Sequence, residues 1–247
     1  MYLTRMRPEQ VREAVSSGLP LIMASGVVEY HGPHSPVGTD VMIAEHLCME
    51  VEKRTPCVVA PPISFGPTTS WAAGPLDGEI DFDPAHFYGY VLELLRRLRM
   101  IGFKRIYIVQ HHQGLEGLQA LSLRRAAAEL MREEALTWGH GWGRKRTEEL
   151  PNPRIFSTIQ VGSIDTYLQA LPDDTGPMPI GHAGKVETQL IQHIDPATVR
   201  MDALKSIERA RLPEWLPDAE EADAAEGAYW LDRCIEGWVR TLNENQA

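Results

Sequence analysis

Residues 19–29 read LPLIMASGVVE, and this stretch decides the fold class. It is apolar nearly throughout and shows no alternation of apolar with polar residues, which predicts a strand buried on both faces. Similar stretches recur as CVVAPPISFG (57–66), FKRIYIVQHH (103–112) and RIFSTIQVGSI (154–164). Strands of this kind belong to parallel sheets that are covered by helices on both sides.

Helical patterns separate and follow these strands. Ile43, Leu47 and Val51 fall four residues apart, which predicts one apolar helix face. Asp40 precedes that helix, and alone it is expected to cap it by accepting free backbone N–H groups. Alternating strands and helices predict an α/β protein with a parallel sheet between helices. The predicted helices cover residues 8–17, 41–54, 83–102, 115–136, 185–194 and 218–243.

Composition narrows the class of protein. The chain has 247 residues, enough for one large α/β domain or two small ones, and no low-complexity linker divides it. A net charge of −10 disfavours nucleic acid as a partner. Three cysteines, far apart and odd in number, indicate a reducing compartment. The polar N-terminus and the lack of an apolar run of about 20 residues predict a cytoplasmic protein without a membrane partner.

Polar side chains gather where three of the predicted strands end. The first cluster, in GVVEYHGPHSPVGTD (26–40), holds Glu29, His31, His34 and Asp40. The second is QHHQ (110–113), and the third is GHAGKVET (181–188). The carboxyl ends of parallel strands meet at one edge of a sheet, so we expect the clusters to converge there.

These residue types suit a metal site. Histidines and carboxylates together bind Zn, Mn or Fe, and a carboxylate can bridge two ions. Water held by such ions loses a proton near neutral pH and becomes a nucleophile. Taken singly, Glu29 reads as a solvated residue at a strand end, so the metal interpretation depends on the clusters meeting in space.

Three segments resemble motifs of the creatininase family of amidohydrolases. Residues 29–40 follow its pattern Glu-x-His-Gly-x-His-x-Pro-x-x-Thr-Asp, and residues 182–188 follow His-Ala-Gly-x-x-Glu-Thr. Residues 110–115, QHHQGL, stand where the family has Asn-Gly-His-Gly-Gly-Asn and keep its histidine and one glycine. Order and spacing agree over about residues 19–195, which leaves the C-terminal tail outside the resemblance.

The resemblance implies a three-layer α/β/α fold with a mostly parallel central sheet, in one domain over residues 1–247, and a centre of two divalent ions (Zn, Mn or Fe). By position, Glu29 and His112 would bind one ion, His31 the other, and Asp40 both. His182 would be the catalytic histidine that passes a proton to the leaving nitrogen. Gly114 stands where creatininase proper has a metal-binding glutamate. Glu187 is the natural substitute, as a metal ligand and catalytic residue, and Gln113 and Glu116 are the alternatives.

The expected activity is hydrolysis of an amide C–N bond in a small molecule, possibly cyclic or formyl, by a hydroxide shared between two metal ions. The altered 110–115 segment and the 71–77 loop argue against strict creatinine specificity, and Trp71, Asp77 and Gln113 are the expected substrate contacts. Two alternatives stay open: a metal-binding protein with altered catalysis, and a metal-dependent lyase or isomerase. The resemblance also implies self-association, usually as a homohexamer.

Overall fold

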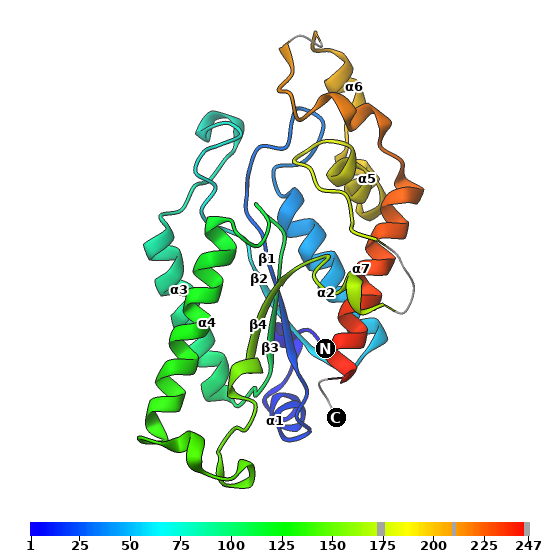
Figure 1. Ribbon diagram of the computed structural model, residues 1–247. Helices are drawn as coiled ribbons and strands as arrows, with labels where there is room; N and C mark the ends of the chain where they lie inside the picture. The colour runs from blue at the N-terminus through cyan, green and yellow to red at the C-terminus, as the bar shows by residue number, and fades with distance from the viewer. Residues whose placement is uncertain (172–175, 209–210, 245–247) are drawn as a thin grey trace.

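A computed structural model describes residues 1–171, 176–208 and 211–244. Its centre is a four-stranded parallel sheet with the strand order β2-β1-β3-β4 (Figure 1). The strands are β1 (Leu21–Ser25), β2 (Val58–Ile63), β3 (Ile106–Gln110) and β4 (Ile159–Ser163). The predicted fold class is confirmed, and within the described residues the sheet is parallel throughout.

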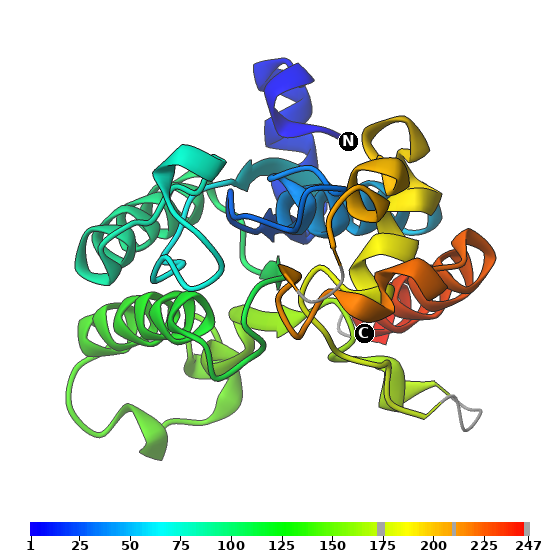
Figure 2. The same cartoon turned by 90° about the horizontal axis from the view of Figure 1, so that it is seen from above.

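Helices cover both faces of this sheet. In β1, Ile22 and Ala24 face one hydrophobic cluster, whereas Leu21 and Met23 face the other. This division makes three layers, with α2, α5 and α7 on one face and α3 and α4 on the other (Figure 2). The helices are α1 (Pro8–Ser16), α2 (Thr39–Arg54), α3 (Pro84–Ile101), α4 (Leu118–Thr137), α5 (Lys185–Ile194), α6 (Met201–Lys205) and α7 (Ala224–Glu244).

The observed elements are mostly shorter than the predicted ones. The strands lose residues at their ends, because those residues leave the hydrogen-bonded ladder and enter the loops that build the site. Helix α5 has the predicted bounds, while the short α6 was not expected. None of the helices in the described ranges is both long and apolar enough to cross a membrane.

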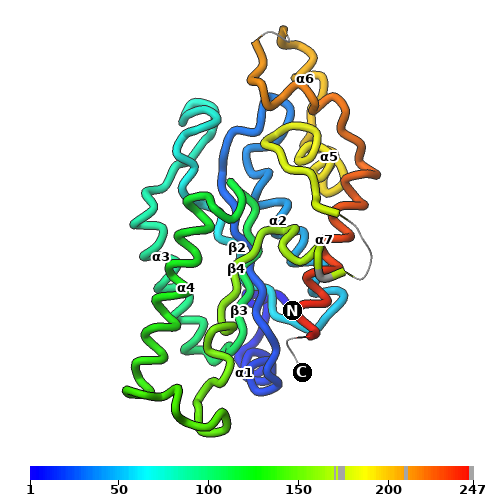
Figure 3. The backbone as a smooth tube through the Cα atoms, viewed as in Figure 1, coloured from blue at the N-terminus to red at the C-terminus, as the bar shows by residue number. Residues whose placement is uncertain are grey.

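Helix α2 corrects one prediction. It begins at Thr39, after Gly38, so Asp40 lies inside its first turn and makes no capping hydrogen bond. The tube in Figure 3 shows that the loop before α2 and the segments around α5 lie toward the same end of the molecule. Asp40 is therefore available for the site at that end.

Candidate metal centre

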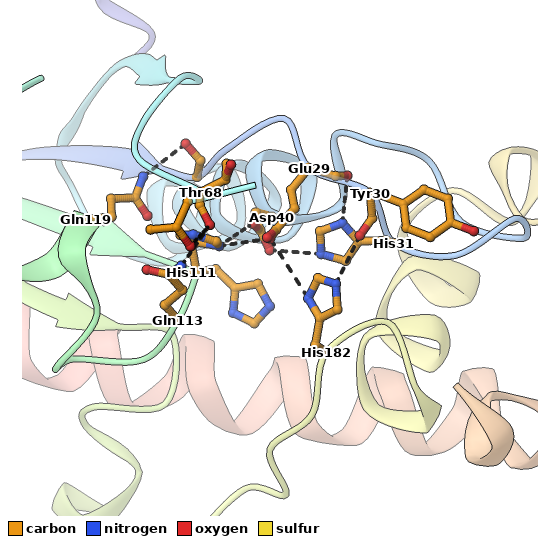
Figure 4. A network of polar contacts seen from close by, with 12 residues as sticks. Glu29, Tyr30, His31, Asp40, Thr68, His111, Gln113, Gln119 and His182 are labelled. Atoms are coloured by element: carbon orange, nitrogen blue, oxygen red, sulfur yellow. Dashed lines mark hydrogen bonds and ion pairs between the residues drawn. The ribbon is translucent and has the colours of Figure 1, made fainter. Parts of the chain in front are cut away.

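Two groups of possible ligands meet at Asp40, beyond the carboxyl ends of the strands. One group is Glu29, Asp40 and His112, and the other is His31, Asp40 and Glu187. Within each group the ligand-type atoms lie within 4.8 Å of one another. Figure 4 shows Glu29, His31 and Asp40 converging from the β1 loop and the start of α2. The three sequence clusters thus come together as predicted, and their metal roles remain predictions.

The first group is tightly packed and oriented. His112 Nδ1 lies 3.1 Å from Glu29 Oε2 and 3.1 Å from Asp40 Oδ2. On the other side of the ring, Nε2 lies 3.2 Å from the Pro67 carbonyl oxygen, to which it can donate a hydrogen bond. Since a donor ring nitrogen leaves the other as the acceptor, this contact turns the lone pair of Nδ1 toward the carboxylates.

The second group repeats this arrangement. His31 Nε2 lies 3.3 Å from Asp40 Oδ1 and 3.5 Å from Glu187 Oε2. His31 Nδ1 lies 3.0 Å from the Glu29 carbonyl oxygen and can donate to it. Each imidazole is therefore fixed by a backbone carbonyl and presents its free nitrogen to Asp40, which is the usual support of a metal-binding histidine.

The electrostatics of both histidines follow from their carboxylate neighbours. Burial lowers the pKa of His31, but Asp40 and Glu187 outweigh burial and raise it to about 9. Burial likewise lowers the pKa of His112, and the carboxylates of Asp40 and Glu29 raise it to about 10. For Asp40, burial raises the pKa, and the two imidazoles outweigh burial and lower it. The site thus strongly favours positive charge between these side chains.

The donor set fits divalent cations. Within the described residues, Glu29 Oε2, His31 Nε2 and Asp40 Oδ2 are buried without a hydrogen-bond partner. Leaving such atoms unpaired is costly, so they call for a partner of another kind. The ion pairs that Glu29, Asp40 and Glu187 make within the described ranges involve histidines only. Buried carboxylates and imidazoles without lysine or arginine are the donor set of Zn, Mn or Fe.

His182 stands beside this centre. Its Nδ1 lies 3.9 Å from Glu29 Oε2, and its Nε2 lies 3.0 Å from the Tyr30 carbonyl oxygen. The ring packs against two indoles that also contact each other, with centroid distances of 5.1 Å to Trp71 and 4.7 Å to Trp215. Burial lowers the pKa of His182 below its ordinary value. Unlike His31 and His112, whose pKa values are raised, His182 is thus readily neutral, which suits a group that takes up and releases a proton.

A cavity of ≈ 710 Å³ opens onto both groups, a size typical of small-molecule sites. Trp71 and Gln113, the predicted substrate contacts, line it, and their contact with substrate stays a prediction. Asp77 is exposed and lies outside the cavity lining within the described residues, so its position does not support the predicted contact. The alternative ligand Glu116 is exposed at the surface beside Arg124, so its position does not support a role as a ligand in the buried centre.

Two glycines shape the backbone around the ligands. A Cβ on Gly26 would lie 2.5 Å from Val41 N, so only glycine lets the end of β1 approach the first turn of α2 this closely. Gly32 has a φ of 78°, in the left-handed region that favours glycine. These positions bring Glu29 and His31 against Asp40, and they explain why the loop sequence folds back.

Neither His111 nor Trp215 was predicted to have a role in this site. His111 Nε2 lies 2.9 Å from Glu187 Oε1, and Trp215 packs on His182. The adjacent pair of histidines at a strand end was the available signal for His111, whereas Trp215 carried none. His34, which shares the first cluster, contacts Thr188 Oγ1 at 2.8 Å and joins the loop to α5.

The fold and the donor set define a protein of the α/β/α class with a cluster of metal-capable side chains, and comparison with known proteins places it in a family. The family described as creatininase, creatinine amidohydrolase, matches residues 4–242. The chain therefore belongs to the creatininase family. A 3-dehydro-scyllo-inosose hydrolase from Thermotoga maritima is 25% identical over 75% of this chain and 64% of its own length, so the match spans slightly under two thirds of that relative. A creatinine amidohydrolase from Pseudomonas putida is 22% identical over 91% of this chain and 88% of its own.

Solved structures agree in fold. A crystal structure of a creatinine amidohydrolase has a TM-score of 0.76 at 18% identity and covers 99% of this chain and 97% of its own. A structure described as creatininase Mn has a TM-score of 0.76 at 20% identity, with coverage of 99% and 98%. A mutant creatininase described as Zn-Zn type has a TM-score of 0.74 at 20% identity, with coverage of 99% and 97%. At these identities the likeness establishes the fold.

Proposed function

We propose that the chain is a metal-dependent amidohydrolase that cleaves an amide C–N bond in a small molecule, with cyclic and formyl amides as the candidate substrates. The observation that carries this proposal is the convergence of two ligand groups on one buried aspartate, Asp40, at the wall of a cavity of ≈ 710 Å³. Membership of the creatininase family and the name of the Pseudomonas putida relative, a creatinine amidohydrolase, support amide hydrolysis, and the name of the Thermotoga maritima relative supports hydrolysis in general.

Glu29, Asp40 and His112 would hold one divalent ion, and His31, Asp40 and Glu187 the other. When bound, the ions would supply an activated water and positive charge against the oxyanion that develops in acyl transfer. Charge balance favours this stoichiometry: three carboxylates carry −3, so two divalent ions leave a net charge of +1. A small positive excess favours binding of an anionic nucleophile and of the oxyanion.

The side chains of this protein orient the reaction and move the proton. With Nε2–H donated to the Tyr30 carbonyl, His182 keeps its lone pair on Nδ1, on the side of Glu29. Nδ1 can accept the proton of the attacking water and deliver it to the departing nitrogen. Trp71 and Trp215 restrict rotation of this ring, so Nδ1 stays directed at the site.

Two variants test these roles, with His86→Ala as the matched control because His86 is 87% exposed on α3. We expect Asp40→Ala to lose bound metal and hydrolysis together. We expect His182→Ala to retain metal with turnover lower by about 10²–10⁴. Elemental analysis and amide turnover measure both. Persistence of metal and hydrolysis in Asp40→Ala would refute the bridging role, and loss of metal in His182→Ala would make that residue a ligand.

A second candidate is hydrolysis of a bond other than C–N. The Thermotoga maritima relative favours it, because an inosose is a carbocyclic ketone with hydroxyl groups and has no C–N bond. Assays of cyclic and formyl amides beside oxidised inositols, in ¹⁸O-labelled water, separate the candidates. Solvent oxygen in a new carboxylate indicates hydrolysis, and the accepted substrate identifies the bond. Product without that label would indicate a lyase or isomerase, and a protein without bound transition metal would favour a binding role.

Two further predictions belong to this proposal. We expect a cytoplasmic location, and self-association up to a homohexamer. Sedimentation at several protein concentrations tests the association, with a monomer at all concentrations as the contrary result.

A further inference from the structure

A second histidine reaches the centre from the end of β3. His111 directly follows the strand, and its backbone N–H donates to the Ser25 carbonyl at 3.0 Å, which ties the segment to the end of β1. Its Nε2 lies 2.9 Å from Glu187 Oε1, and both residues line the cavity. Figure 4 shows the His111 imidazole on the β3 side of the site. The contact joins β3 to α5 across the cavity wall.

The two oxygens of Glu187 have different neighbours. Oε2 accepts a hydrogen bond from Ala183 N at 2.6 Å and lies 3.5 Å from His31 Nε2, on the side of the ligand group. Oε1 is directed at His111. Rotation about the last bond of a glutamate side chain is soft, so a partner on Oε1 adds to the Ala183 N–H in holding Oε2 toward the ligand group.

From this asymmetry we infer that His111 is a positioning residue: it holds the Glu187 carboxylate so that Oε2 is presented to an ion bound by His31, Asp40 and Glu187. The inference rests on the proposed function. It assigns a partner to the residue that replaces the glutamate missing at Gly114. Partners of this kind orient metal ligands, and their loss typically lowers metal affinity about 10–100-fold.

The geometry also predicts that the effect is confined to one ion. Within the described residues His111 makes an ion pair with Glu187 and none with Glu29 or Asp40, the carboxylates of the other group. The group of Glu29, Asp40 and His112 has its own support from the Pro67 carbonyl. Loss of the His111 side chain should therefore weaken one ion and leave the other unchanged.

A purely structural role makes a different prediction. Glu187 lies in the first turn of α5, and Ala183, whose N–H it accepts, has a φ of 54°. If His111 serves only to stabilise this helix start, its removal lowers the stability of the metal-free protein and affects both ions equally. The number of ions affected separates the two roles.

The experiment measures binding of Zn²⁺ to the metal-free full chain by competition with a chromophoric chelator, and the unfolding temperature of each metal-free variant. His111→Phe keeps a ring and removes the donor. His111→Gln restores a donor that can reach a carboxylate. His86→Phe, at an exposed histidine on α3, is the control. We expect His111→Phe to bind one ion as the unaltered protein does and the other about 10–100-fold more weakly. We expect His111→Gln to recover most of this loss and His86→Phe to match the unaltered protein.

The outcomes separate this inference from the function on which it rests. Unaltered protein that fails to bind two ions overturns both. If it binds two ions and His111→Phe does so with unchanged affinity, the positioning role is wrong and the proposed function stands. Equal weakening of both ions, or no recovery in His111→Gln, also overturns the positioning role.

Discussion

Substitution of Gly26 by alanine should disturb the site through the backbone. An added Cβ would lie 2.5 Å from Val41 N and 2.6 Å from the Asp40 carbonyl carbon, both main-chain atoms of α2. Gly26 is held in place, since its N–H donates to the Ile63 carbonyl at 2.9 Å and its own carbonyl accepts from Gln119 Nε2 at 3.0 Å. The main chain at the start of α2 must therefore shift away from the added methyl group.

The magnitude follows from these distances. Ordinary van der Waals contact begins at 3.4 Å, so the first turn of α2 would have to retreat by about 0.9 Å. Overpacking of this kind costs about 1–3 kcal/mol of unfolding free energy. Metal–ligand distances tolerate only about 0.2 Å, and a misplacement of about 1 Å at a catalytic site costs roughly 10²-fold in rate. Asp40 moves with the turn, so both metal affinity and turnover should fall.

The matched control is Gly89→Ala in α3. A Cβ there meets no atom within 4 Å, and alanine favours a helix by about 1 kcal/mol over glycine. Urea unfolding of both metal-free variants, with metal titration and amide turnover, checks the prediction. We expect opposite signs in stability and a metal defect in Gly26→Ala alone. Unchanged stability and metal affinity in Gly26→Ala would refute the argument that this close approach positions Asp40.

Three further predictions concern the cavity, the core and the ions. Trp71→Ala should lower kcat/KM about tenfold, because the ring packs on the proposed proton-transfer histidine, while Tyr90→Ala, equally exposed at 57% against 58%, should not. Trp238→Phe should lower the free energy of unfolding in urea by about 1–3 kcal/mol, because the buried indole N–H donates to the Ile164 carbonyl at 2.9 Å. Tyr229→Phe, at an exposed position on the same helix, should change it by less than about 0.5 kcal/mol. Equal effects of the two substitutions would contradict this assignment. Divalent ions at about 100 times their Kd should add about 2.7 kcal/mol per site to the free energy of unfolding, which raises the unfolding temperature by about 5–10 °C per site. An unchanged melting curve would contradict binding of the ions to the folded protein.

The sequence predicted the layers and the edge at which the site lies, because both follow from local patterns. An apolar run such as residues 19–29 has few ways to be buried, and parallel strands place their carboxyl ends together. The start of α5 was predicted to the residue, since the amphipathic helical pattern begins immediately after Gly184. Element ends elsewhere were less predictable, because residues beside a strand can join either the ladder or the loop.

What local pattern left open was decided by contacts between distant segments. Asp40 beside a helix start is compatible with a cap or a ligand, and its approach to His31 and His112 settles its orientation. His111 lies in a turn after β3, where the alternation of a strand no longer fixes side-chain direction, and its contact with Glu187 spans 76 positions. Trp215 reaches His182 from a segment that carried no site signal.

The ligands and the cavity wall are built by different means, and this bears on where specificity resides. Each histidine of the two ligand groups is oriented by a main-chain carbonyl, from Glu29 or Pro67, and Glu187 by a main-chain N–H together with the His111 side chain. Main-chain partners survive changes of neighbouring side chains, so such a centre can persist while its surroundings diverge. The cavity wall, in contrast, takes Trp71 and Gln113 from the loops that follow β2 and β3, and loops tolerate substitution. We therefore expect exchanges in residues 68–81 and 113–115, which leave His111 and His112 in place, to alter substrate choice more than metal content. Assay of such exchanges against amides and oxidised inositols would show whether the bond cleaved is set by the wall or by the centre.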